Sequence, residues 1–157
     1  MYLLIIAVAV MLLPGKARAQ CPWINKVTVA AIYGIRNDSQ AISTTETNTS
    51  CLFQFQGKRE RFRLFVDIQR AAEYQPLVAA LSKGCASKGE LLRGIGNEAF
   101  VCQGRVLSRY SSEVIGRVRN SVFMVQSAAF TKNSGLGEGG PRQQAVIAAQ
   151  QVAGNLF

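Results

Sequence analysis

Two neighbouring segments of the chain carry apolar residues with a period of two, and the positions between them are polar except for Leu52 and Phe65. Every second residue is apolar in residues 51–55 and again in residues 62–68, and a polar segment that begins at Gly57 separates the two runs. A period of two is typical of a strand with one buried face, so the pattern predicts an antiparallel hairpin. Its second face is wetter and basic, whereas its apolar face is formed by Cys51, Phe53, Phe55, Phe62, Leu64, Val66 and Ile68.

Helical patterns appear in three other segments. The first helix is expected to begin after Asn25, whose side chain can cap it, and to close at Gly34 in the left-handed conformation. The second is expected over residues 71–83, with Pro76 near its first turn and Gly84 at its end. The last helix follows residue 141 and has one apolar stripe, formed by Ala145, Ala148, Ala149, Val152 and Leu156.

The remaining segments complete the prediction of the fold. Residues 35–50 are mostly polar and without periodicity, which favours a surface loop. Residues 91–102 are expected to form a turn that leads into a strand, and two further strands are expected over residues 113–118 and 122–128. Strands that follow one another as hairpins, with the helices set apart, indicate an α+β domain: an antiparallel sheet of about five strands flanked by helices.

The first residues have the pattern of a secretory signal peptide. An apolar run over residues 3–13 is followed by Pro14-Gly15 and then by Ala17-Arg18-Ala19. Eleven apolar residues are too few to cross a bilayer, which needs roughly 20. We therefore expect cleavage after Ala19, a signal peptide over residues 1–19, and a single secreted or periplasmic domain over residues 20–157 with no permanent membrane span.

Export determines how the four cysteines are interpreted. An even number of cysteines in an oxidising environment predicts two disulfides, and four cysteines allow three pairings. We favour the local pairing of Cys21 with Cys51 and of Cys85 with Cys102. The chain has no histidine and no Cys-x-x-Cys pair, so no metal site and no cofactor are expected.

One short motif carries a resemblance to known proteins. Gly94-Ile95-Gly96-Asn97-Glu98-Ala99-Phe100, together with the early helix, the strand pair and the alanine-rich last helix, resembles small secreted bacterial domains. These are related to the extracellular sensor domain of mycobacterial serine/threonine kinases and to actinobacterial lipoproteins of the PsbP-like fold. The resemblance implies a fold more than a function. The chain departs from these relatives in having neither a lipid-attachment cysteine nor a kinase domain.

Catalytic motifs are weak throughout the chain. Gly94-x-Gly96-x-x-Ala99 has the spacing of a dinucleotide fingerprint, but a strand is expected where that fold needs a helix. Residues 135–140 are also glycine-rich, but the chain ends before a second strand is possible. Ser108, Ser111 and Ser112 have no histidine to activate them. We predict that the protein is not an enzyme.

The charge points to an anionic partner. The net charge of +9 falls to +7 when Lys16 and Arg18 are removed with the signal peptide. A charge of +7 is modest for a nucleic-acid binder, so no nucleic acid is expected as a partner. An anion site is predicted if the sheet gathers two groups of cations on one side. The competing interpretation is a solvated strand face or charges that protect a sheet edge. The six cations are Lys58, Arg59, Arg61, Arg63, Arg117 and Arg119.

Three functions remain open from the sequence. We favour a noncatalytic binding or sensor-like domain for an anionic or amphipathic ligand, with an envelope polymer, a lipid surface or an envelope protein as partner. The alternatives are a protein-interaction or inhibitor module that uses residues 35–50 or 132–140, and a hydrolase of unfamiliar design. A filled interface between sheet and helices would favour the protein-interaction module over a carrier of a ligand.

Overall fold

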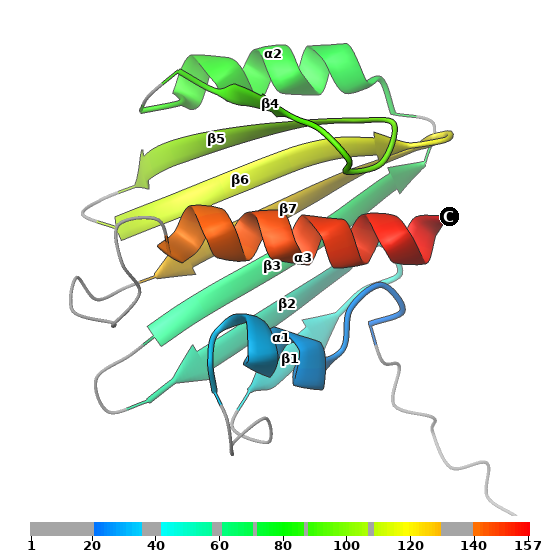
Figure 1. The fold of residues 1–157 in the computed structure, drawn as a ribbon. Helices are drawn as coiled ribbons and strands as arrows, with labels where there is room; N and C mark the ends of the chain where they lie inside the picture. Colours follow the sequence, from blue (N-terminus) through cyan, green and yellow to red (C-terminus); the bar gives the residue numbers. More distant parts are fainter. Residues whose placement is uncertain are drawn as a thin grey trace, which may run out of the picture.

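A seven-stranded antiparallel sheet forms the centre of the domain within the residues that the structure describes. This computed structural model describes residues 21–35, 42–57, 61–70, 72–86, 88–106, 109–129 and 140–157. The strand order is β1-β2-β3-β7-β6-β5-β4, so β3 and β7 meet at the middle of the sheet and β1 and β4 form its edges. Helices α3 and α1 lie in front of the sheet, and α2 lies beside its β4–β5 end (Figure 1).

The element order alternates single helices with groups of strands. The strands are β1 (Ser43–Glu46), β2 (Ser50–Gln56), β3 (Arg61–Arg70), β4 (Glu90–Leu92), β5 (Glu98–Val106), β6 (Arg109–Val118) and β7 (Ser121–Ala129). The helices are α1 (Lys26–Ile32), α2 (Tyr74–Gly84) and α3 (Gly140–Leu156). The α+β class predicted from the sequence is therefore confirmed.

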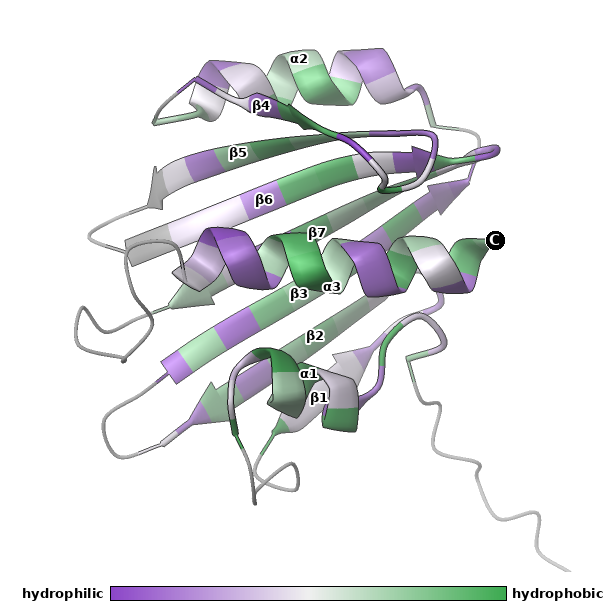
Figure 2. Cartoon of the chain, in the orientation of Figure 1, coloured by the Kyte–Doolittle hydropathy of each residue, from purple (hydrophilic) through white to green (hydrophobic). Residues whose placement is uncertain are grey.

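Helix α3 packs flat across the middle of one face of the sheet. Ala145, Ala148 and Ala149 are completely buried, and their small side chains let the helix come close to β6 and β7. Beneath it, Gly116 makes room for the ring of Phe123 on the neighbouring strand, because a Cβ at that glycine would collide with the ring. Hydrophobic bands run along the strands behind α3 (Figure 2). This interface is filled by side chains.

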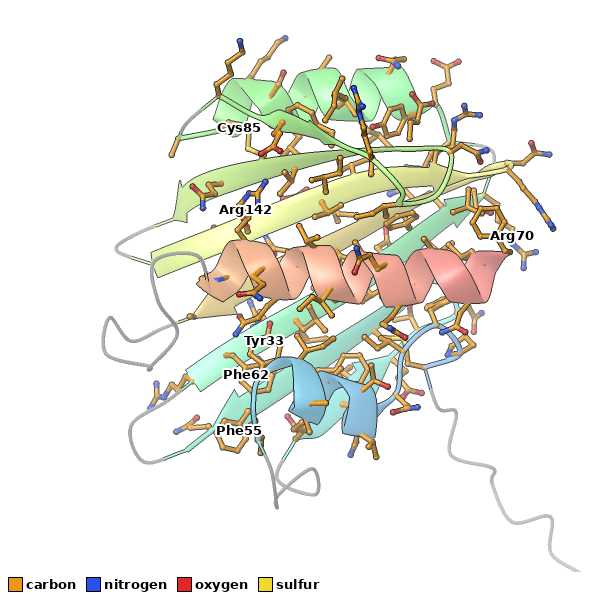
Figure 3. The ribbon with its side chains drawn as sticks, in the orientation of Figure 1. Tyr33, Phe55, Phe62, Arg70, Cys85 and Arg142 are labelled. Carbon is orange, nitrogen blue, oxygen red and sulfur yellow. A yellow bond between two sulfur atoms is a disulfide. The ribbon has the colours of Figure 1, made fainter. Side chains whose placement is uncertain are left out.

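Helix α1 covers the β2–β3 end of the same face. Asn25 caps it by accepting a 2.9 Å hydrogen bond from the Thr28 amide, and Gly34 follows it with φ 71°, as the sequence predicted. Tyr33 stacks on Phe62 with ring centroids 3.7 Å apart, and Phe55 stacks on the same ring (Figure 3). The Tyr33 hydroxyl lies 2.7 Å from the Ser127 hydroxyl. Burial of the Tyr33 side chain raises the pKa of its hydroxyl group.

Helix α2 packs on the other face of the sheet. Its Tyr74 forms a small buried cluster with Ile115 of β6 and Val122 of β7. This cluster is separate from the main core, because successive residues of a strand point to opposite faces. Val114 and Phe123 thus belong to the α3 side. Among the described residues, α2 is the helix that covers the second face, and it covers that face only in part.

The two disulfides have the predicted local pairing. Cys21 is bonded to Cys51, with Cα atoms 5.9 Å apart, which ties the segment before α1 to β2. Cys85 is bonded to Cys102, with Cα atoms 5.5 Å apart, which ties the end of α2 to β5. Each face of the sheet therefore has one covalent link to the helical layer that covers it.

The number of strands is a correction to the sequence prediction. We expected about five strands, but the described sheet has seven because β1 and β4 add one strand at each edge. Residues 43–46 were expected in a surface loop, and they instead pair with β2 from Ser43 opposite Gln54 to Glu46 opposite Cys51. An edge strand needs neither an apolar face nor a second neighbour, so a polar segment rich in threonine suffices. The predicted signal peptide lies outside the described residues.

Candidate functional site

Part of the second sheet face is exposed, and we call it the open face. Its residues point away from α3 and lie beyond the cover of α2, and each is exposed or half-buried. The open face consists of Leu52, Gln54, Arg61, Arg63, Phe65, Gln126 and Ala128.

The strand register places these side chains in rows across the sheet. In one row, Leu52 of β2 lies opposite Phe65 of β3, and Phe65 lies opposite Gln126 of β7. In the next row, Arg63 lies between Gln54 and Ala128. Directly opposed side chains on neighbouring strands have Cβ atoms about 5 Å apart, so the Leu52–Phe65 pair forms an apolar strip with Arg63 beside it. The face therefore combines apolar area and positive charge.

The four cations that the structure describes, out of the six predicted, lie at two separate places. Arg61 and Arg63 lie on the open face, and Arg117 points to the same side of the sheet. Arg117, however, is opposite Val122, which is opposite Gln69, so it is displaced along the strands from Arg61 by eight residues or about 26 Å. Lys58 and Arg59 lie outside the described residues. The convergence that the sequence suggested is therefore not produced by this register.

Arg117 and Arg119 have local structural partners. Arg117 donates a 2.7 Å hydrogen bond to Glu98, directly across the β5–β6 pair. Arg119 occupies the β6–β7 turn with φ 52°, and its amide donates a 2.7 Å bond to the Asn97 side chain. Its guanidinium lies 5.8 Å from the centroid of the Phe157 ring. Both residues hold the end of the sheet together.

The glycine motif has a structural explanation at this end. Gly94 and Gly96 have φ values of 77° and 61°, which glycine adopts without strain. At Gly96 a Cβ would also collide with the Arg117 carbonyl. The motif thus makes the tight turn that docks the start of β5 on β6. It continues as a strand, which confirms that it is not a dinucleotide fingerprint.

Glu113 lies at the border between the open face and α2. It is opposite Gln126 on one side and Cys102 on the other. Burial raises the pKa of its carboxyl group above the ordinary value. A carboxylate in this position is costly in its charged form.

The serines of β6 are bonded to the backbone. The Ser111 hydroxyl donates a 3.0 Å bond to the Gly104 carbonyl, and the Ser112 hydroxyl donates a 3.3 Å bond to the Cys102 carbonyl. Ser108 and residues 135–140 lie outside the described residues. The part of the chain that the structure describes contains no group of three or more His, Cys, Asp and Glu side chains able to hold a metal ion.

A hollow opens at the opposite end of the sheet from Arg61, and we call it the end groove. Its volume is about 790 Å³, and it lies where β3 and α3 end and β2 begins. Sequence reasoning missed it, because its walls come from five distant segments; the one signal was the single tryptophan. Its walls include Trp23, Asn48, Thr49, Asp67, Gln69 and Arg70.

Comparisons with known proteins add no further assignment. In the described residues, every helix is too short or too polar to cross a membrane. The chain matches no known protein family and no characterised protein. The resemblance to PsbP-like domains therefore stays a prediction, as do the absence of enzymatic activity and the identity of any partner.

Proposed function

We propose that the protein is an exported, noncatalytic binding domain that attaches through its open face to an anionic, amphipathic surface. The observation that supports this most directly is the exposure of Arg61 and Arg63 beside the half-buried pair Leu52 and Phe65, on a part of the sheet that no described helix covers. Apolar side chains gain free energy by leaving water, and arginine binds phosphate or carboxylate groups.

A surface fits this geometry better than an enclosed ligand. The interface between α3 and the sheet is filled by buried side chains such as Leu64, Val125 and Ala148, which favours a ligand bound at the surface over one carried between these two layers. The open face is instead part of a sheet spanned by β2, β3 and β7. A broad face of this kind is suited to contact with a bilayer or with another protein.

The disulfides are compatible with function outside the cytoplasm. Both cysteine pairs are oxidised, which is the state expected in a secreted or periplasmic protein. The anionic groups of that compartment include phospholipid headgroups and envelope polymers. We favour a lipid surface, because it offers anionic headgroups and apolar chains together, as the open face does.

Co-sedimentation with lipid vesicles tests the proposal. The protein should bind phosphatidylglycerol vesicles more tightly than phosphatidylcholine vesicles, and the binding should weaken as salt is raised. The double variant Arg61→Gln/Arg63→Gln should lose about 2 kcal/mol of binding, or roughly 30-fold in affinity, because each basic residue near such a surface contributes about 1 kcal/mol.

A double variant of equal charge is the control. Lys26→Gln/Arg93→Gln removes the same charge from α1, on the other side of the sheet, and from the loop after β4, and it should bind almost as the wild type does. Equal losses in the two double variants would reduce the effect to net charge and refute the open face. If neither lipid binds, and an envelope protein is captured by the wild type and released by Phe65→Ala, the open face binds a protein and the lipid proposal is wrong.

A further inference from the structure

The end groove is separate from the open-face cations and has a different chemistry. Gln69 and Arg70 line it from the end of β3, whereas Arg61 and Arg63 lie at the beginning of the same strand. Arg70 lies at the far end of β3 from the Phe62 ring (Figure 3). With a volume of about 790 Å³, the groove is within the range of small-molecule sites, which is about 300 to 1,000 Å³.

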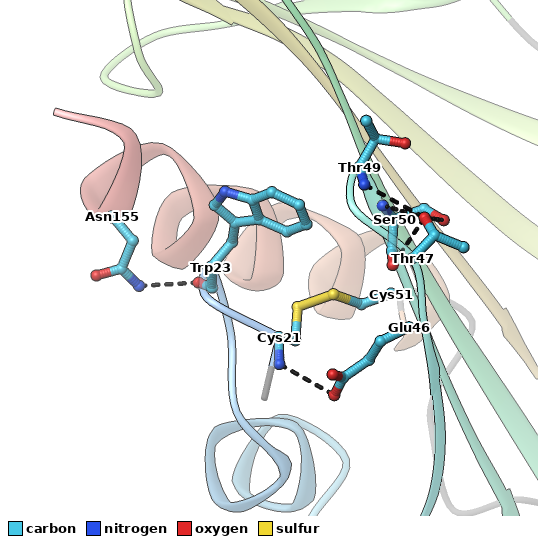
Figure 4. Close-up of a disulfide and its surroundings, with 8 residues drawn as sticks. All are labelled: Cys21, Trp23, Glu46, Thr47, Thr49, Ser50, Cys51 and Asn155. Atoms are coloured by element: carbon cyan, nitrogen blue, oxygen red, sulfur yellow. Dashed lines mark hydrogen bonds between the residues drawn. A yellow bond between two sulfur atoms is a disulfide. The ribbon is translucent and has the colours of Figure 1, made fainter. Parts of the chain in front are cut away.

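Trp23 is held in this groove from two sides. The Cys21 disulfide fixes the preceding residues to β2, and the Asn155 side chain donates a 2.8 Å hydrogen bond to the Trp23 carbonyl from the end of α3 (Figure 4). The indole ring is half-buried and packs against the main core. A ring fixed in this way offers a preformed apolar plate at the groove.

The opposite wall is also ordered. The Thr47 hydroxyl accepts a 2.9 Å bond from the Ser50 amide and a 3.3 Å bond from the Thr49 amide, which closes the turn between β1 and β2. This turn presents Asn48 and Thr49 to the groove. On β3, Gln69 donates a 3.0 Å bond to the Asp67 carboxylate.

The polar groups of the groove are balanced in charge. Arg70 and Asp67 are the charged residues among its described lining, one of each sign. The two charged residues lie on opposite sides of β3, so the groove as a whole carries no net charge and does not concentrate cations as the open face does. The amide of Asn48 offers both donors and an acceptor, which suits groups that also donate and accept, such as hydroxyls.

We propose that the end groove binds a neutral oligosaccharide, with a sugar ring lying on the indole of Trp23. The C–H face of a pyranose is apolar and matches the face of an aromatic ring, while its hydroxyls point outward at the rim, where Asn48, Thr49 and Arg70 can bond to them. The site is independent of the proposed lipid contact. Together the two sites would give the domain one surface for a membrane and one for a glycan.

The single tryptophan makes the test direct, because the whole indole fluorescence of the chain comes from Trp23. We expect a saturable change in emission when maltotriose, cellotriose or chitotriose is titrated into the disulfide-bonded protein, with heat of binding at the same concentrations by calorimetry. No response to any of the three sugars at 10 mM by either method would overturn the proposal. Competition by inorganic phosphate would also contradict it, because it would make the groove an anion site.

Two amide variants locate the site. Asn48→Ala removes an exposed groove side chain and should weaken the binding of the responding sugar tenfold or more. Gln143→Ala removes an exposed glutamine near the other end of α3 and should leave binding unchanged. Equal affinity in the Asn48→Ala variant would place the sugar elsewhere and refute the groove. Vesicle binding by the same variant should be normal, which separates this result from the test of the open face.

Discussion

The two faces of the sheet are made from the same alternating strands but are covered to different extents. On the α3 side, Leu64, Val66 and Val125 are completely buried beneath helices α1 and α3. On the other side, α2 buries a small cluster around Ile115 and Val122 and leaves Leu52 and Phe65 at the surface. Stability is therefore concentrated on one face, and the second face keeps side chains available for a partner. Alternation alone does not distinguish these two roles.

Two phenylalanines give the largest expected contrast between the faces. Phe123 is fully buried on the α3 side, and Phe123→Ala should lower the free energy of unfolding by about 3 to 5 kcal/mol, because it leaves a cavity under the helix. Phe65 is half-buried on the open face, and Phe65→Ala should cost about 1 kcal/mol or less. Denaturant unfolding measures both values. Similar losses would show that the open face is part of the core.

Removing each disulfide tests separately the helix on each face of the sheet. In the chain-entropy account, removing either disulfide costs about 3 to 4 kcal/mol, since the bonded residues are 30 and 17 positions apart. Cys85→Ser/Cys102→Ser should increase hydrogen exchange first in α2, which has few other contacts. In Cys21→Ser/Cys51→Ser, the first increase should occur in α1. Early hydrogen exchange throughout α3 in Cys85→Ser/Cys102→Ser would show that the helices on the two faces of the sheet do not open independently.

Glu113 gives the smallest effect and the one that depends on pH. Burial raises the pKa of Glu113 in the folded protein, so folding favours the neutral carboxyl group. The folded state is therefore destabilised as the pH rises through that pKa and the group becomes charged. Glu113→Gln should therefore raise the free energy of unfolding near pH 7, by about 1 kcal/mol or less, and by almost nothing near pH 3. Glu73→Gln, at an exposed position before α2, is the control and should show no such trend. A pH-independent gain would rule out titration of Glu113.

Most of the fold follows from local patterns in the sequence. The hairpin of β2 and β3, the late strands and the three helices were predicted, because buried faces impose periods of 2 and 3.6 residues on the chain. Strands β1 and β4 were not predicted. They are short edge strands of 4 and 3 residues, and their pairing depends on a neighbour that the local sequence does not specify.

The candidate sites were less accessible to prediction. The charges of Arg61 and Arg63 were visible, and the alternation placed them on the wetter face. Their distance from Arg117 depends on the register of β3, β7 and β6, which no local pattern determines. The end groove depends on still more contacts: Trp23, Thr49 and Asn155 come from distant segments and meet only when α3 and the β1–β2 turn have packed around the end of β3.

The alanines of α3 have an effect beyond their own packing. The side chains of Ala145, Ala148 and Ala149 are single buried methyl groups, so they determine how closely the helix axis approaches the strands. Asn155 lies in the last turn of the same helix, and its side chain donates a hydrogen bond to the Trp23 carbonyl. A larger residue at position 148 would tilt α3 or lift it from the sheet. This displacement of the helix would reach the contact with Trp23, about 10 Å further along the helix. The width of the groove is thus adjusted from the middle of the domain.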